Sequence, residues 1–173
     1  MKIILSFLVF IALSVGLMAN GYDEGLKAHK SHDFTKIATE YEMACEKNDY
    51  KACAELGFIY FSGFGLAKDT QKAFSYLEKA CNGQNIVGCR GLARMYDLGE
   101  GTKQDNKKAI QLYEKVCEAK DTIGCMNLGI IYEYGENVKV DLEKAKTYFS
   151  KACHYGDKQG CELLVELTNK SKR

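Results

Sequence analysis

The sequence predicts an all-α solenoid built from repeated antiparallel helix pairs. Three observations indicate this fold. Eight cysteines recur in pairs with a fixed gap, the other motifs keep the same step of 36 residues, and each repeat holds two helical patterns and no alternating strand pattern. Repeats of about 20 to 50 residues are typical of solenoids, in which each unit buries its apolar face only against its neighbours.

The first 19 residues have the pattern of a secretory signal peptide. Lys2 precedes a mostly apolar run over residues 3–15, and small residues lead to a cleavage point predicted after Ala19. An uncleaved membrane anchor is the alternative, although the run is a little short for a span of about 20 residues. We therefore expect residues 1–19 to be removed and residues 20–173 to form a single solenoid domain, secreted or periplasmic, without a stable membrane anchor.

The cysteines form four pairs with seven residues between the two members: Cys45 and Cys53, Cys81 and Cys89, Cys117 and Cys125, Cys153 and Cys161. On one continuous helix such positions would lie about 12 Å apart, whereas a disulfide needs Cα atoms within about 7 Å. Residues that end helices or tolerate turns, such as Asn48 and Asp49, fall inside each gap. Zinc ligands usually come two to four residues apart, and an even cysteine count in an exported chain indicates disulfides. We predict four disulfides, each across a tight turn between two helices.

The segment after each second cysteine is predicted to be the first helix of a repeat. It carries a recurring Leu-Gly-x-x-Tyr pattern, with alanine in place of glycine once: Leu56-Gly57 with Tyr60, Leu92-Ala93 with Tyr96, and Leu128-Gly129 with Tyr132. The small residue allows the adjacent helix to approach closely, while Leu and Tyr fill the gap. The following pairs, Gly63-x-Gly65, Gly99-x-Gly101 and Gly135-x-Asn137, are predicted to end these helices in a left-handed turn.

A repeated aspartate is predicted to begin each second helix: Asp33, Asp69, Asp105 and Asp141. Its carboxylate can accept hydrogen bonds from the unpaired amides at the positive end of the helix dipole. Four residues later come Ile37, Ala73, Ala109 and Ala145, which are expected to keep the helix crossing tight. A further four residues on, Tyr41, Leu77, Tyr113 and Phe149 should form an apolar ladder on the same face.

These motifs together resemble the Sel-one-like repeat, a relative of the tetratricopeptide repeat. With the seven-residue cysteine gap, the chain is similar to the Helicobacter cysteine-rich protein family, whose repeats each carry a disulfide between paired helices. The resemblance covers residues 22–168 and implies a right-handed superhelical solenoid of about four repeats. It departs at the ends, where residues 25–32 stand in for a first helix and Leu164 is followed by Val165 and Thr168 instead of Gly and Tyr. Atypical end units are what the caps of a solenoid need.

The family resemblance also implies penicillin binding and slow β-lactam hydrolysis, and proteins of this kind often carry a β-lactamase name. The residues themselves do not provide a serine β-lactamase site, because Ser-x-x-Lys, Ser-Asp-Asn and Lys-Thr-Gly are all absent from the sequence. The histidines are few, and His29 and His32 are interpreted as solvated surface, with His154 alone further on. We predict no metal and no cofactor, and we assign no catalytic residue.

A second hypothesis from the sequence is a binding scaffold. The formal net charge of +1 gives no driving force for nonspecific nucleic-acid binding. The first helices of a helical solenoid form a concave groove, which typically binds extended peptides or proteins. The groove residues expected here are Phe58, Arg90, Arg94, Met126, Ile130 and Tyr134, with Ala54 beside Phe58.

Arg90 and Arg94 lie one helical turn apart between apolar neighbours. Together they could bind a carboxylate, and the alternative is that both are ordinary surface residues. The expected partner is a peptide, a protein or a cell-wall fragment, with β-lactams as the ligands that the family resemblance adds. The chain is expected to act as a monomer.

Overall fold

The computed structural model describes residues 34–135 and 138–170, and these residues form eight helices of 13 residues each, with no strand among them. The helices are α2 (Phe34–Glu46), α3 (Tyr50–Ser62), α4 (Thr70–Asn82), α5 (Ile86–Leu98), α6 (Asn106–Glu118), α7 (Thr122–Tyr134), α8 (Leu142–His154) and α9 (Lys158–Lys170). The predicted signal peptide, Asp33, His29 and His32 lie outside the described residues.

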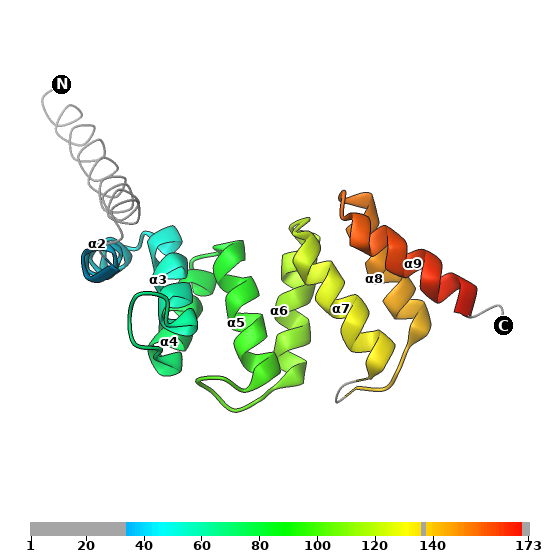
Figure 1. Cartoon of the computed structure of the whole chain (residues 1–173), viewed down its shortest axis with the longest axis horizontal. Coiled ribbons are helices and arrows are strands. Elements are labelled where there is room, and N and C mark those ends of the chain that lie inside the picture. Colours follow the sequence, from blue (N-terminus) through cyan, green and yellow to red (C-terminus); the bar gives the residue numbers. More distant parts are fainter. Residues whose placement is uncertain (1–33, 136–137, 171–173) are drawn as a thin grey trace, which may run out of the picture. The chain divides into compact units, whose positions relative to one another are not determined.

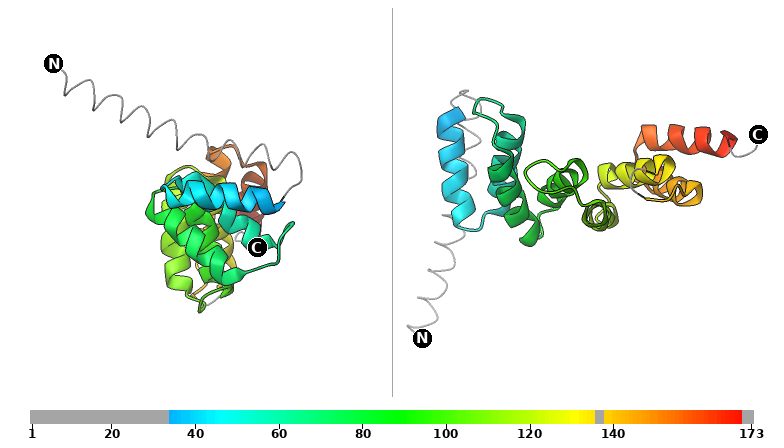
Figure 2. Two further views of the ribbon diagram at one scale, coloured as in Figure 1. Left: turned by 90° about the vertical axis from the view of Figure 1, so that its left-hand side faces the viewer. Right: turned by 90° about the horizontal axis from the view of Figure 1, so that it is seen from below.

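The described residues fall into two compact units, unit 1 up to Gly88 and unit 2 from Cys89 on, so the division lies near the start of α5. In unit 1, α3 packs against both α2 and α4. In unit 2, α7 packs against α6 and α8, and α8 packs against α9 (Figures 1 and 2). The prediction of an all-α fold made of antiparallel helix pairs is confirmed. The single solenoid domain, the right-handed superhelix and the monomeric state stay predictions.

Three disulfides join the end of a second helix to the start of the following first helix. The Cα–Cα distances are 4.7 Å for Cys45–Cys53, 4.7 Å for Cys117–Cys125 and 4.6 Å for Cys153–Cys161. Cys81 and Cys89 are also disulfide-bonded, and no cysteine in the described part of the chain is free. Each cysteine gap therefore holds a tight turn, as the spacing predicts.

The turn inside each cysteine gap has one residue in the left-handed conformation, and this residue recurs every 36 positions: Asn48, Gln84, Lys120 and Gly156. At the first turn the amide of Asn48 donates to the carbonyl of Cys45 at 2.9 Å, and the amide of Asp49 donates to that of Ala44 at 3.0 Å. This pair of hydrogen bonds satisfies carbonyls that the helix end leaves unpaired. The turn thus brings the second cysteine back toward the first.

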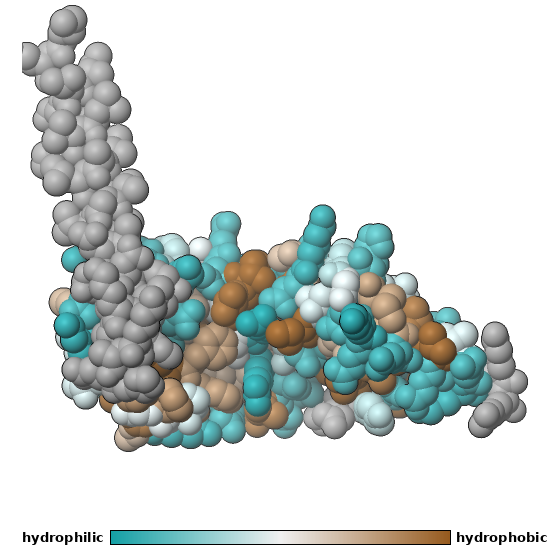
Figure 3. Space-filling model, turned by 45° about the horizontal axis from the view of Figure 1, so that its top comes forward, coloured by the Kyte–Doolittle hydropathy of each residue, from teal (hydrophilic) through white to brown (hydrophobic). Residues whose placement is uncertain are grey.

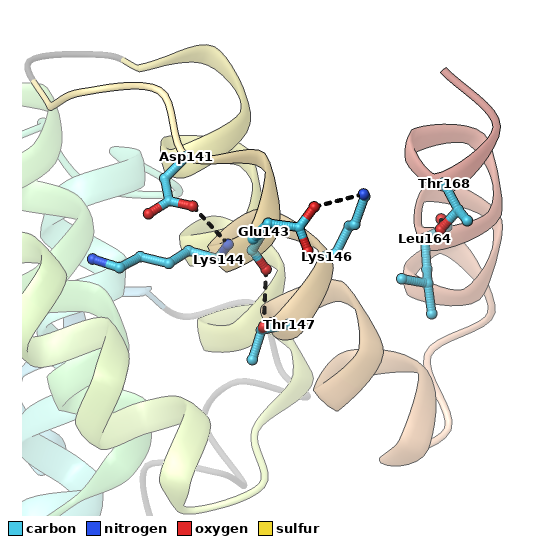
Figure 4. Close-up of polar contacts among 7 residues, drawn as sticks. All are labelled: Asp141, Glu143, Lys144, Lys146, Thr147, Leu164 and Thr168. Carbon is cyan, nitrogen blue, oxygen red and sulfur yellow. Dashed lines mark hydrogen bonds and ion pairs between the residues drawn. The ribbon is translucent and has the colours of Figure 1, made fainter. Parts of the chain in front are cut away.

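The predicted aspartate caps are confirmed wherever the structure describes them. The carboxylates of Asp69, Asp105 and Asp141 accept the amides of the residues three positions on, at 2.9, 3.0 and 3.0 Å. Figure 4 shows the cap at the start of α8, together with the ion pair between Glu143 and Lys146. The first helices also begin with capping side chains, in addition to the predicted series. These side chains form a second capping series, which also recurs every 36 residues: Asp49, Asn85, Asp121 and Asp157.

In the core of each unit, a small residue on the first helix of a repeat packs against an apolar ladder residue. That ladder residue belongs to the second helix that follows in the chain. Ile37, Ala73, Ala109 and Ala145 are all 0% exposed, and the ladder residues Tyr41, Leu77, Tyr113 and Phe149 are at most 2% exposed. A Cβ atom on Gly57 would lie 2.6 Å from Leu77, and one on Gly129 would lie 2.4 Å from Phe149. The predicted roles of these positions in close helix packing are confirmed.

Candidate binding surface

Helix α7 is apolar on two opposite sides. Its inner side is buried and contains Gly124, Cys125, Met126, Leu128, Gly129 and Ile131. On the outer side Ile123, Ile130 and Tyr134 are 46%, 39% and 65% exposed. Positions seven and eleven residues apart fall on one side of a helix, so these three residues form a continuous row that we call the α7 apolar stripe. Among the exposed surfaces of the first helices in unit 2, the α7 apolar stripe has the largest apolar side chains.

Helix α5 contributes cations to the same unit. Arg94 is exposed and occupies the position one repeat before Ile130, while Leu98, also exposed, occupies the position one repeat before Tyr134. We define the candidate binding surface as the α7 apolar stripe with Arg90, Arg94 and Leu98. Figure 3 shows, on one face of the molecule, that exposed hydrophobic residues gather in patches between hydrophilic ones.

Arg90 is held by an ion pair within unit 2. Its Nη1 donates to Oδ2 of Asp121 at 2.7 Å, and the two side chains are 27% and 17% exposed. The other carboxylate oxygen of Asp121 accepts the amide of Ile123 at 3.0 Å and so caps α7. Arg90 therefore fixes the start of α7, and most of its charge is already balanced. The structure supports a structural role for Arg90 more than the predicted role as one half of a carboxylate fork.

Arg94 acts electrostatically on the buried Tyr113. Burial raises the pKa of the Tyr113 phenol above its ordinary value, the carboxylate of Asp97 raises it further, and the guanidinium of Arg94 lowers it. The charges of Arg94 and Asp97 thus both act on the buried Tyr113, in opposite directions. Arg94 is the exposed cation of the candidate binding surface, and a ligand carboxylate would compete there with Asp97.

Two sequence-based expectations about the groove are wrong. Met126 is 8% exposed and belongs to the buried core of unit 2, and Ala54 is 1% exposed and packs with Cys45 and Cys53. Both positions point more toward the neighbouring helix than a count from the Leu positions suggests. Phe58 is half-buried and belongs to unit 1, so a groove that continues from Phe58 to Arg94 stays a prediction.

A second feature of unit 2 is a hollow of ≈ 570 Å³ beside the loop between α7 and α8. Its lining combines the apolar Tyr132, Val138, Val140 and Leu142 with the charged Lys139, Asp141, Glu143 and Lys144. The Nζ atom of Lys144 lies 4.8 Å from the centre of the Tyr132 ring, and the same ring stacks on Tyr148 at 5.7 Å. The hollow thus has the Tyr132 ring as an aromatic wall and two cations, Lys139 and Lys144, in its lining.

The described residues offer no metal centre, because no three His, Cys, Asp or Glu side chains among them come together as ligands. Within the ranges 34–135 and 138–170, no helix has the length and apolar character needed to cross a membrane. The disulfides indicate an oxidising, extracytoplasmic compartment, because thiols in the cytosol are kept reduced.

Fold, capped turns and repeated disulfides define a class of protein: an extracytoplasmic helical-repeat scaffold. Residues 51–85, 86–121 and 122–157 match the Sel1 repeat. The chain belongs to the Sel1 repeat family, which is the Sel-one-like repeat that its motifs resemble, and it is related to the Helicobacter cysteine-rich proteins. The prediction of this family is confirmed.

Three relatives illustrate the similarity. Cysteine-rich protein B of Helicobacter pylori has 35% sequence identity and a TM-score of 0.60, over 76% of this chain and 95% of that protein. HcpC of Helicobacter pylori, named as a candidate beta-lactamase, is 40% identical over 48 residues, which are 28% of this chain. The protective antigen c5321 of uropathogenic Escherichia coli shares the fold, with 24% identity and a TM-score of 0.79 over 88% of this chain. This chain spans only 17% of the length of HcpC and 34% of that of c5321.

Proposed function

We propose that this protein is a secreted or periplasmic scaffold that binds a peptide or a segment of another protein on the candidate binding surface. The observation that carries this proposal is the α7 apolar stripe. A surface helix normally buries its apolar side and exposes polar residues, whereas α7 buries one apolar side and exposes another. Exposed apolar side chains that lie together, next to charged ones, are typical of interaction sites.

The chemistry of the surface favours a partner with apolar side chains and a carboxylate. Ile123, Ile130 and Tyr134 can bury apolar groups of a ligand, and Tyr134 offers a large ring with a polar end. Arg94 supplies an exposed cation, and Arg90 is held by its ion pair with Asp121. A cell-wall fragment carrying a free carboxylate would meet the same requirements, and the measurement below separates it from a peptide.

Replacement of stripe residues should weaken binding of the partner. We expect random peptides displayed on phage to yield binders of the oxidised protein, and Ile130→Ser or Tyr134→Ala to weaken a selected synthetic peptide by about tenfold or more, because each removes buried apolar contact. Arg94→Ala should weaken a peptide with a free carboxylate more than its amidated form. Isothermal titration calorimetry gives the affinities.

The matched control is Val165→Ser, because Val165 is 60% exposed on α9 and lies outside the candidate binding surface. Wild-type affinity in both stripe variants, or equal losses in the control, would place the site elsewhere. If the library yields no peptide while muropeptides bind, the ligand is a cell-wall fragment. Arg90→Ala does not give a clean test, since it also removes the ion pair that holds the start of α7.

β-Lactam hydrolysis is the second candidate function, and the similarity to HcpC favours it. The hollow beside the α7–α8 loop has room for a small molecule, and Lys144 could pair with the carboxylate of a β-lactam. With no activated nucleophile assigned, we expect kcat/KM for a chromogenic cephalosporin below about 10⁴ M⁻¹s⁻¹. Turnover at or above that value would show a dedicated hydrolase, and Lys144→Ala would then test the hollow as its site.

A further inference from the structure

The disulfide between Cys153 and Cys161 differs from the others in its exposure. Its two cysteines are partly exposed, whereas Cys45, Cys53, Cys117 and Cys125 are at most 1% exposed. In all three of these bridges the two cysteines are 8 positions apart in the sequence, and their Cα atoms lie 4.6 to 4.7 Å apart. They therefore differ in solvent access while their local geometry is the same.

The buried bridges are covered by the second helix that follows them. Cys45 and Cys53 pack with Ala80 of α4, and Cys117 and Cys125 belong to the same core as Ala152 of α8. The bridge between Cys153 and Cys161 comes after α8, at the start of α9, and no described helix follows α9. Within the described part of the chain, Cys153 and Cys161 remain partly exposed.

The sequence of α9 also opposes such a cover. Val165 occupies the position that Gly57 and Gly129 hold in the earlier first helices, where even a single added carbon would collide with the next second helix. Val165 is 60% exposed. A valine there would collide with a second helix that packed on α9 as α4 packs on Gly57 or α8 on Gly129.

We propose that the disulfide between Cys153 and Cys161 is a thiol–disulfide exchange site for a low-molecular-weight thiol. A thiolate bonds to one of the two sulfurs, the protein S–S bond breaks, and the other sulfur leaves as a thiolate that takes a proton from water. A second thiol then attacks the mixed disulfide and is released bonded to the first. Two electrons pass from the two thiols to the protein disulfide, which becomes two thiols. Exchange requires solvent access to the bridge, and Cys153 and Cys161 are partly exposed whereas Cys45, Cys53, Cys117 and Cys125 are buried.

The consequence of reduction is confined to α9. Without the bridge, α9 is held by packing of Gly160 against Ala152, by the buried Leu167, by the partly buried Leu163 and Leu164, and by the contact of Lys170 with Glu133 at 3.9 Å. Helix ends with few buried contacts open locally at low free energy. Reduction should therefore loosen α9 while the inner helix pairs stay closed.

The test is differential alkylation of the oxidised protein during exposure to reduced glutathione, with dithiothreitol in a parallel series. Samples quenched with iodoacetamide are mapped by mass spectrometry. We expect Cys153 and Cys161 to become alkylated at least tenfold faster than Cys45 and Cys53 or Cys117 and Cys125, which serve as matched controls. Hydrogen exchange of the partly reduced protein should be at least tenfold faster in α9 and unchanged in α3. Equal rates for all bridges, or faster opening of a buried one, would overturn the proposal.

A variant with Cys153→Ser and Cys161→Ser separates local from global opening. Its inner bridges should resist glutathione as they do in the wild type. If they open faster in this variant by tenfold or more, loss of the terminal bridge unfolds the whole unit, and the exchange site is not a local one. Dilute urea gives the complementary result, since opening by global unfolding accelerates every bridge together.

Discussion

Reduction of all the disulfides should lower the melting temperature of the helical circular dichroism signal by about 20 °C or more. Each bridge joins cysteines that are 8 positions apart in the sequence. Closing a loop of this length stabilises the fold by roughly 2 to 3 kcal/mol in the chain-entropy account. Four such loops contribute about 10 kcal/mol, and 1 kcal/mol shifts the melting temperature of a chain of this size by about 2 to 4 °C. Melting curves with and without a phosphine reductant measure the difference.

The bridges should not contribute equally. The pair of substitutions Cys117→Ser and Cys125→Ser removes a disulfide and also puts hydroxyl groups into a core where both positions are at most 1% exposed. The pair Cys153→Ser and Cys161→Ser removes a partly exposed bridge and should cost less. An unchanged melting temperature after complete reduction would mean that helix packing alone supports the fold.

Features that depend on local sequence were predictable. The caps at Asp69, Asp105 and Asp141 depend only on a carboxylate before a helical pattern. The buried ladder that includes Tyr113 and Phe149 follows from the spacing of apolar residues four positions after small ones. The disulfides follow from the distance that a helix would impose on cysteines eight positions apart. None of these needs the position of a distant helix.

Features that depend on how helices cross were not predictable in the same way. The sequence pattern predicts Met126 at the surface, but the direction of its side chain depends on the approach of the neighbouring helices, and Met126 is buried. The sequence pattern predicts Asp121 to be a turn residue, whereas its ion pair with Arg90 of the preceding first helix depends on the three-dimensional path of the chain. The second capping series has a signal in the sequence, because Asp or Asn recurs every 36 residues from Asp49. The same residue types also favour turns, so this recurrence alone does not distinguish a turn residue from a helix cap.

Substitution of Gly129 by valine should destabilise unit 2 by about 3 kcal/mol. The position lies against Phe149, which is 0% exposed, and a Cβ atom there would be 2.4 Å from Cε1 and 2.5 Å from Cδ1 of that ring. The ring is enclosed and cannot swing away, so α7 and α8 must move apart. Urea unfolding followed by circular dichroism gives the change in the free energy of unfolding.

The equivalent position on α9, which is Val165, provides the control. Val165 is 60% exposed with no described helix over it, so Val165→Ala should change stability by less than about 0.5 kcal/mol. The double variant Gly129→Val with Phe149→Ala tests the cause of the effect, because the smaller side chain gives the valine room. Its loss should be smaller than the sum of the two single losses, since both changes act on one contact. Additive losses, or a Gly129→Val protein as stable as the wild type, would show that the close approach of α8 to α7 at Gly129 is not what packs unit 2.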